Sequence, residues 1–320
     1  MYDILRKVYQ VATGRLFKGR INITDFYQPA DRVTDAGLDW VDSDARPQDA
    51  PFYLFLHYMD PHDPYRDPER PGKGYARVQM ANPDPEKYRD AFIRSYVFEI
   101  EYMDGHLGRL IDGLKQRGLY DNTLIVFTAD HGEEFHEHGG WWHGLSLYDE
   151  QIKVPLMLKL PGNAARGSYV NDLARHVDLA PTLAQFARLA PDAKWQGQPL
   201  LTGQFASNNA NVSFVHSHLD FEGIRLKSLR SFNRKLILAN EGNKRDFAPE
   251  EFYDLGNDPG EQHNLADEAD AEVLLFKNTL EKMDDFIQTG AVEAQAFDAS
   301  DLSPELQEQL KSIGYGETED

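Results

Sequence analysis

The chain has 320 residues, and its 53 acidic residues against 33 basic ones give a formal net charge of −20. A surface this acidic repels phosphate backbones and anionic lipids, and the sequence has no concentrated basic patch, so nucleic-acid and membrane-surface proteins are excluded. The chain has no cysteine, which excludes disulfide scaffolds, thiolate metal sites and cysteine nucleophiles. No apolar run approaches the roughly 18 residues that a membrane-spanning helix needs.

The first elements in chain order are two helices and a strand. Residues 2–16 and 30–41 repeat apolar side chains at helical spacing, and Asp31 is placed to cap the second helix. Residues 52–58 form a short and dense run of apolar and aromatic side chains. Such a run between polar flanks predicts a fully buried strand of a parallel sheet.

A long helix and two further strands follow. Residues 61–85 are rich in proline and glycine, and residues 86–117 then show a helical pattern that Gly118 closes. Residues 123–129 predict a second buried strand, which runs into a polar cluster. The apolar run at residues 154–160 predicts another strand.

The composition changes after about residue 203. A helix is expected before this change, at residues 177–189. Short alternating runs after it predict antiparallel strands of a smaller α+β unit, and a final helix precedes an acidic tail. The expected strands are residues 212–216, 224–229 and 235–238, and the final helix is residues 271–287.

The alternation of strands and helices predicts an α/β fold. Polar clusters follow the carboxyl ends of the predicted strands, which is where sites form in open α/β sheets. We therefore expect an α/β core domain over residues 1–203 and a C-terminal α+β subdomain with a tail over residues 204–320. This layout favours an enzyme.

Four of the eleven histidines lie between His131 and His143, among several carboxylates. Asp130 and His131 are adjacent at the end of a predicted strand, where both could reach one ion. Mixed oxygen and nitrogen ligation suits Ca²⁺, Mg²⁺, Mn²⁺ or Zn²⁺. Alternatively, Asp130 caps a turn and the histidines belong to a solvated loop. A solvated, flexible loop explains His136 and His138 as well as a site does.

A second polar cluster follows the first predicted strand. His57 lies inside the apolar run, so a buried neutral histidine bonded to the backbone is the favoured interpretation. His62 stands between two prolines, with Asp60 and Asp63 beside it to orient the ring or raise its pKa. There His62 could bind an anionic group or protonate a leaving oxygen, or it could form part of a stiff turn without a ligand.

Four blocks of the sequence stand out in chain order, at residues 51–65, 121–133, 143–156 and 252–266. They resemble, in the same order, blocks of the sulfatases of the alkaline phosphatase superfamily, and residues 310–315 resemble the closing segment of the family. The resemblance implies an alkaline-phosphatase-like sheet sandwiched by helices, with its N-terminal strands missing, and a smaller C-terminal α+β subdomain.

The resemblance also implies a role for four residues. Asp130 and His131 match the pair that ligates the active-site divalent metal, usually Ca²⁺ in sulfatases, with Mg²⁺ or Mn²⁺ as alternatives. His62 matches a histidine that contacts the sulfate and its leaving oxygen. His143 falls where many sulfatases have a sulfate-binding lysine and other superfamily members have a metal-binding histidine. Both roles stay open for His143.

The nucleophile of the family is absent from these 320 residues. In sulfatases a Cys or Ser in a Cys/Ser-x-Pro-x-Arg segment becomes formylglycine, and neither a cysteine nor such a serine segment occurs here. The resemblance therefore implies an N-terminally truncated sulfatase that is inactive alone, with formylglycine not encoded. Because the acidic metal ligands of that region are also absent, metal binding should be weak. An exposed sheet edge would invite another chain to complete the sheet.

The leading hypothesis is a sulfatase-family hydrolase that cleaves sulfate esters of small molecules or glycans with a divalent metal. A phosphodiesterase, phosphonate hydrolase or phosphotransferase of the same superfamily is the alternative, which His143 in place of lysine favours. A non-catalytic fragment or subunit is the third hypothesis. Localisation stays open, because complete family members are often periplasmic, secreted or lysosomal, whereas the residues after Met1 do not form a signal peptide.

Overall fold

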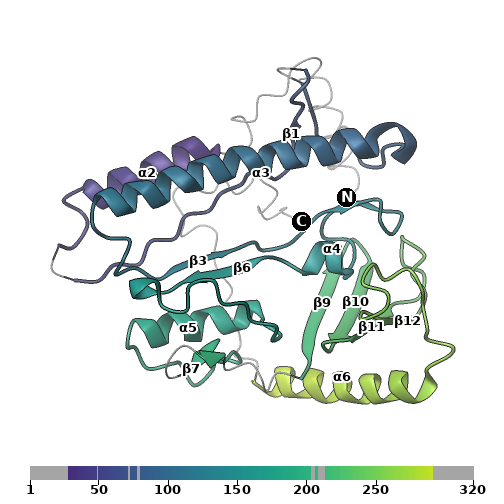
Figure 1. Cartoon of the computed structure of the whole chain (residues 1–320). Helices are drawn as coiled ribbons and strands as arrows, with labels where there is room; N and C mark the ends of the chain where they lie inside the picture. Colours follow the sequence, from purple (N-terminus) through teal and green to yellow (C-terminus); the bar gives the residue numbers. More distant parts are fainter. Residues whose placement is uncertain are drawn as a thin grey trace, which may run out of the picture. The chain divides into compact units, whose positions relative to one another are not determined.

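The computed structural model describes residues 28–290, apart from residues 49, 71–72, 78–79, 203–205 and 208–212. Its contacts divide the chain after Tyr120 into two compact units, which we describe one at a time (Figure 1). The helix expected at residues 2–16 and the acidic tail lie outside the described residues. The domain boundary expected between residues 203 and 204 stays a prediction.

Two helices build most of the first unit. Helix α2 (Ala30–Asp42) and helix α3 (Pro85–Gln116) confirm the helices expected from apolar spacing, and they pack against each other (Figure 1). The expected cap at Asp31 is wrong. The carbonyl of Pro29 accepts the first N–H groups of α2, so Asp31 falls inside the first turn.

Helix α3 has conventional ends. The Asp84 carboxylate accepts a hydrogen bond of 3.1 Å from the backbone N–H of Glu86, which satisfies one of the free donors of the first turn. Gly118 ends the helical region with a positive φ of 66°, a conformation that glycine adopts without strain. Both ends of α3 were therefore readable from the sequence to within a residue.

The segment at residues 51–59 differs from its prediction. It is extended, but no described residue pairs with it as a strand. Its side chains alternate between half-buried and exposed, and Tyr53 and Phe55 are 69% and 71% exposed. Without neighbouring strands on both sides, the dense apolar run cannot be buried on both faces. His57, expected to be buried, belongs to the exposed row.

The half-buried row of this segment holds it to α2. A side chain at Gly37 would come within 2.9 Å of Leu56, so the glycine allows the segment to approach the helix closely. The hydroxyl groups of Thr34 and Tyr58 share a hydrogen bond of 2.8 Å. Beyond the segment, Tyr65 and Tyr75 in the strand pair β1 (Tyr65–Arg66) and β2 (Gly74–Tyr75) pack on Phe92 of α3.

The second unit begins with a pair of strands. Strand β3 (Ile125–Thr128) and strand β6 (Leu156–Lys159) match the runs expected at residues 123–129 and 154–160 (Figure 1). They pair with each other in antiparallel register, and the four residues of β3 are half-buried rather than fully buried. The parallel pairing and full burial expected for this strand are therefore wrong among the described residues.

A four-stranded antiparallel sheet forms the later part of the second unit, with strand order β12-β11-β10-β9. Helix α6 (Asp270–Gly290) packs on one face of it (Figure 1), where Phe276 and Leu280 meet Leu229, Leu236 and Phe252 of the sheet. The strands expected at residues 224–229 and 235–238 lie in this sheet. The strand expected at residues 212–216 begins later, and β12 was not predicted. The strands are β9 (Val215–Phe221), β10 (Ile224–Arg230), β11 (Arg234–Ala239) and β12 (Glu250–Asp254).

Short elements complete the second unit. The helix expected at residues 177–189 is a 3₁₀ turn (His176–Asp178) continued by helix α5 (Leu179–Phe186). Within the described residues, no helix combines the length and the apolar character that crossing a bilayer requires. The remaining elements are β4 (Glu134–Phe135), β5 (Trp141–Trp142), α4 (Asp149–Ile152), a 3₁₀ turn (Pro161–Asn163), α5 (Leu179–Phe186), β7 (Leu201–Thr202) and β8 (Ala206–Ser207).

A buried lysine ties α4 to the sheet. Lys235 on β11 is fully buried, and its ammonium lies 3.0 Å from the Asp149 carboxylate and 2.7 Å from that of Glu261. A buried cation with one partner would be costly, and the second carboxylate lowers the cost of burying this ammonium. The Asp149 pKa is lowered because Lys235 and Arg230 outweigh the effect of burial. The start of α4 is thereby anchored to the C-terminal sheet.

Candidate active site

A short hairpin brings two of the predicted site residues together. Strands β4 and β5 pair in antiparallel register, Glu134 with Trp142 and Phe135 with Trp141. His131 precedes this hairpin and His143 follows it, so the pairing returns the chain to its starting point. The two imidazole rings stack with their centroids 4.1 Å apart and their planes at 27°.

Asp130 lies beside His131 at the end of the strand that precedes the hairpin. One carboxylate oxygen accepts a 3.0 Å hydrogen bond from the backbone N–H of His131, which is the turn-capping role considered from the sequence. The other oxygen lies 3.7 Å from Nε2 of His131, and the side chain of Asp130 is 70% exposed. Capping a turn and facing a ligand are therefore compatible for Asp130.

The geometry of this pair fits one divalent cation in part. Nδ1 of His131 lies 2.8 Å from the carbonyl of Gly132, so a proton there would leave the lone pair of Nε2 facing the Asp130 carboxylate. An oxygen and a nitrogen 3.7 Å apart can both contact an ion that takes ligands at about 2.0–2.6 Å. In the part of the chain that the structure describes, no group of three or more such side chains is arranged around one ion.

His143 is held by Glu133. Its Nδ1 lies 3.2 and 3.3 Å from the two carboxylate oxygens, and the side chains are 18% and 4% exposed. A buried carboxylate in this position orients the ring and favours the tautomer that carries the proton on Nδ1. Glu133 was not among the site residues predicted from the sequence, although its place in the acidic and histidine-rich cluster was a signal.

His138 corrects an expectation. The sequence suggested a solvated and flexible loop, but His138 is 10% exposed and stacks on Tyr148 with centroids 3.6 Å apart. Its two ring nitrogens contact the Glu150 carboxylate at 2.7 Å and the carbonyl of Glu261 at 3.0 Å. Burial alone would lower the pKa of His138, but these two partners outweigh it and raise the pKa. Contacts with Glu150 and with the more distant Glu261 therefore hold His138 in a buried position.

His136, the other histidine considered weak, has a positive φ of 71°. Its ring lies 5.5 Å from that of Trp141 on the opposite strand of the hairpin. The described contacts give His136 a place in the turn and no convergence with His131 or His143. This agrees with the loop interpretation of that residue.

His62 belongs to the first unit. Its Nδ1 lies 2.7 Å from the carbonyl of Asp63 and 3.6 Å from the carboxylate of the same residue, and the ring is one third exposed. The orienting partner is therefore Asp63. The expected pairing with Asp60 is wrong, because Asp60 is buried and faces Arg66 and Glu99 instead.

Arg66 organises the polar interior around Asp60. The guanidinium makes a bidentate ion pair with the fully buried Glu99, with distances of 2.7 and 2.6 Å, and reaches Asp60 only at 3.3 Å. Arg66 also stacks over the ring of Tyr102 at 4.1 Å. Burial, with the neighbouring Glu99 carboxylate, raises the pKa of Asp60 to about 7. One arginine thus neutralises one of the two acids well and the other poorly.

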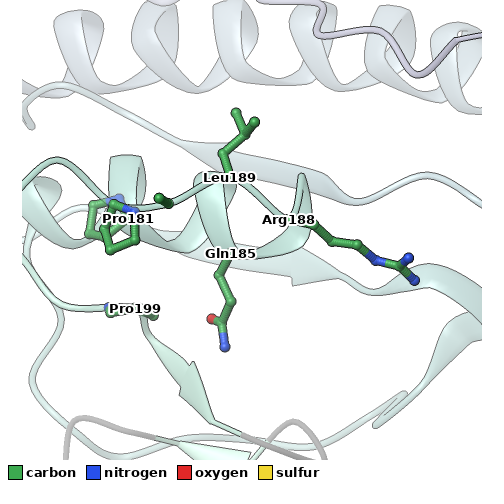
Figure 2. A pocket seen from close by; sticks show the side chains of 7 residues that line it. Pro181, Gln185, Arg188, Leu189 and Pro199 are labelled. Carbon is green, nitrogen blue, oxygen red and sulfur yellow. The ribbon is translucent and has the colours of Figure 1, made fainter.

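The cavities of the second unit lie elsewhere. One of about 460 Å³ is formed by α5 and the turn after it, between Pro181, Arg188 and Pro199 (Figure 2). Another of about 560 Å³ lies between the start of β12 and the start of α6. Neither of these two cavities is lined by Asp130, His131 or His143.

Two family models match the chain. The model described as "Sulfatase" matches residues 7–189, and the one described as "N-sulphoglucosamine sulphohydrolase, C-terminal" matches residues 136–288. The uncharacterized sulfatase YidJ of Escherichia coli (strain K12) is 27% identical over 296 residues, which cover 82% of this chain and 57% of that protein.

Two solved structures extend the comparison. A protein solved in complex with its substrate D-glucosamine-2-N,6-O-disulfate aligns with a TM-score of 0.53 at 26% identity, over 63% of this chain and 41% of that one. The phosphonate monoester hydrolase of Agrobacterium radiobacter aligns with a TM-score of 0.63 at 22% identity, over 84% of this chain and 63% of that one, a likeness of fold alone. The chain thus spans between 41% and 63% of the length of these relatives.

These findings define an α/β protein with the alkaline-phosphatase-like fold, which confirms the expected fold class. The first family model alone covers more than half of the 320 residues. The chain belongs to the sulfatase family of the alkaline phosphatase superfamily.

Proposed function

We propose that this chain carries part of a site that hydrolyses sulfate esters. The observation that supports the proposal most is the stacked pair of His131 and His143, with Asp130 and Glu133 as their carboxylate neighbours. Such a cluster offers proton donors and a partial cation site on one surface, which is what cleavage of an anionic ester requires.

Asp130 and His131 are the proposed ligands of a divalent cation, with Ca²⁺ preferred and Mg²⁺ or Mn²⁺ as alternatives. Such an ion, when bound, withdraws charge from a sulfate oxygen. As an imidazolium oriented by Glu133, His143 binds the sulfate or donates a proton to the leaving oxygen, and His62 of the first unit has the same proposed role. A place for His143 among the metal ligands is the other assignment, and the test below separates the two.

The proposed substrates are sulfate esters of sugars. The support is the relative solved with D-glucosamine-2-N,6-O-disulfate as its substrate. We expect slow turnover by the 320-residue chain alone, because it contains neither a cysteine nor a Ser-x-Pro-x-Arg serine from which formylglycine could form. Losing a covalent nucleophile usually removes several orders of magnitude of rate.

Titration calorimetry with Ca²⁺ and Mn²⁺ tests the cation site. We expect weak binding to the chain, with dissociation constants of about 10⁻⁴–10⁻³ M, because only two ligands converge. Asp130→Asn should abolish it. Asp192→Asn is the matched control, since Asp192 also accepts a backbone N–H two residues on, at 2.9 Å, yet lies outside the cluster. Binding that survives the loss of both Asp130 and His131 would place the cation elsewhere, and loss on His143→Ala would make His143 a ligand.

Hydrolysis of an aryl sulfate, compared with the matching aryl phosphate, tests the reaction. A rate above background that Asp130→Asn removes would support a catalytic site for sulfate esters. A clear preference for the phosphate would favour the phosphoesterase alternative. Absence of turnover on both esters together with absence of cation binding would support the third hypothesis, that of a non-catalytic fragment or subunit.

A further inference from the structure

A buried carboxylate lies under the hairpin that carries the two histidines. The side chain of Glu134 is fully buried, and it receives hydrogen bonds from three different segments. Arg245 donates to both oxygens at 2.8 Å, the backbone N–H of Gly140 donates at 2.8 Å, and Nε2 of Gln151 donates at 2.7 Å. Four donors satisfy this carboxylate fully, which is the condition under which a buried charge is stable.

Gln151 extends this arrangement to both histidines. Its backbone carbonyl accepts the N–H of Gly132, directly after His131, at 2.7 Å. Its side-chain oxygen lies 3.3 and 3.4 Å from the N–H groups of Leu145 and Ser146, which follow His143 closely. Gln151 is 2% exposed, so water cannot replace these partners easily. One residue, through its backbone carbonyl and its side chain, therefore holds the chain on both sides of the stacked rings.

Arg245 fixes the position of this assembly. It comes from the loop after β11 and also donates to the carbonyl of His138 at 3.0 Å, and its guanidinium lies 4.9 Å from the ring centroid of Phe247. A side chain at Gly140 would overlap the guanidinium, so the glycine leaves room for it. With three hydrogen bonds to the hairpin and 13% exposure, Arg245 is the main cation facing it.

We propose that Arg245 is a positioning residue for the His131 and His143 pair, acting through Glu134 and Gln151. The importance of that pair for sulfate esters rests on the proposed function, whereas the positioning itself does not. A bidentate guanidinium defines both the distance and the orientation of the carboxylate, which a single ammonium cannot do. Without it, Glu134 would be a buried charge without a cation, and the hairpin would shift to reach water.

Nuclear magnetic resonance of the full 320-residue chain with labelled histidine tests this proposal. In the unchanged chain, rings stacked at 4.1 Å should show a nuclear Overhauser effect between His131 and His143. Arg245→Met should remove this effect, and Arg245→Lys should restore part of it. The control is Arg234→Met, because Arg234 at the start of β11 is also paired with carboxylates, those of Asp254 and Glu272, but lies away from the hairpin.

The double variant Arg245→Met with Glu134→Met keeps the test decisive if the single variant does not fold. Removing both charges avoids the uncompensated carboxylate, so folding should return while the effect between the rings stays lost. An effect that persists in a folded Arg245→Met or double variant overturns the proposal, and so does its loss in Arg234→Met. Aryl sulfate hydrolysis is measured separately, and any rate above background in the unchanged chain should fall in Arg245→Met. Absence of divalent cation binding by the unchanged chain would contradict the proposed function and leave the positioning result intact.

Discussion

Asp60 illustrates how one carboxyl group can make the first unit sensitive to pH. It is 1% exposed, and the only cation that reaches it is already engaged by Glu99 among the contacts of the described residues. Burial raises its pKa to about 7, with Glu99 as the next cause. The folded state therefore prefers a protonated Asp60, while the unfolded chain ionises near the ordinary aspartate value of about 3.9.

The stability of the first unit should fall as the pH rises between about 4 and 7. A carboxyl group with a raised pKa in the folded state contributes fully below its unfolded pKa, and this contribution is lost as the pH passes the folded pKa. Asp60→Asn imitates the protonated form and should remove about 4 kcal/mol of this pH dependence, since each pKa unit corresponds to about 1.4 kcal/mol. Hydrogen exchange of the α3 amides at pH 4.5 and pH 8 measures this change in the stability of the first unit. Asp44→Asn, at an exposed position of the same unit, is the control, and an equal pH dependence in Asp60→Asn would contradict the assignment.

The residues of the candidate site were only partly predictable. Asp130, His131 and His143 could be selected because imidazoles and carboxylates cluster after a predicted strand. The burial of His138 could not, since it depends on Tyr148 and on a carbonyl 123 residues further along the chain. The spacing of residues in the sequence indicates only local neighbours. From this spacing alone, a buried histidine that holds a hairpin in place cannot be distinguished from a solvated histidine.

At the scale of elements, the extended segment at residues 51–59 is the most unusual. One row of its side chains packs towards α2, and the other row presents Tyr53 and Phe55 at 69% and 71% exposure. An extended backbone with an exposed aromatic row is a template for pairing with another polypeptide. The segment is thus suited to association between chains.

Replacing both exposed aromatics by lysine should reduce self-association. In Tyr53→Lys with Phe55→Lys, we expect a larger monomer fraction in sedimentation velocity experiments, because charged side chains oppose edge pairing. The free energy of unfolding should change by less than about 0.5 kcal/mol, since exposed positions contribute little. Tyr169→Lys, at an 86% exposed position outside the segment, should leave the monomer fraction unchanged. Equal association in the double variant and the unchanged chain would argue against the segment as the contact.

Helices were easier to predict than strand pairing. The apolar spacing of α2, α3 and α6 is a local property, and their observed bounds agree with it to within a few residues. Whether β3 pairs parallel or antiparallel depends on which strand lies beside it, and this partner is chosen by tertiary packing. The same holds for the run at residues 52–58, whose composition indicates a strand while its burial depends on neighbours.

At the scale of the whole molecule, the net charge of −20 is the dominant property. Many acids in the interior have partners, as Asp149 and Glu261 have in Lys235 and Glu134 has in Arg245. These local pairs do not change the excess of negative charge over the chain. Repulsion among like charges destabilises the compact state, and salt screens it.

Raising the NaCl concentration should therefore stabilise the chain. Between about 0.01 M and about 0.15 M the Debye length falls from about 30 Å to about 8 Å. We expect the melting temperature in scanning calorimetry to rise by roughly 2–4 °C, which corresponds to about 1 kcal/mol. Tetramethylammonium chloride should act equally, and EDTA in every sample removes divalent cations. A constant or falling melting temperature would mean that screened attractive pairs outweigh the repulsion.

The distance along the chain between Glu134 and Arg245 also affects how the site is made during synthesis. The two residues are 111 positions apart. At about 5–20 residues per second, a ribosome needs about 6–22 s to add that length. Throughout this interval the hairpin with its two histidines has been synthesised without the guanidinium that neutralises Glu134. The speed of translation between Glu134 and Arg245 thus determines how long the Glu134 carboxylate of the nascent chain lacks its counter-ion.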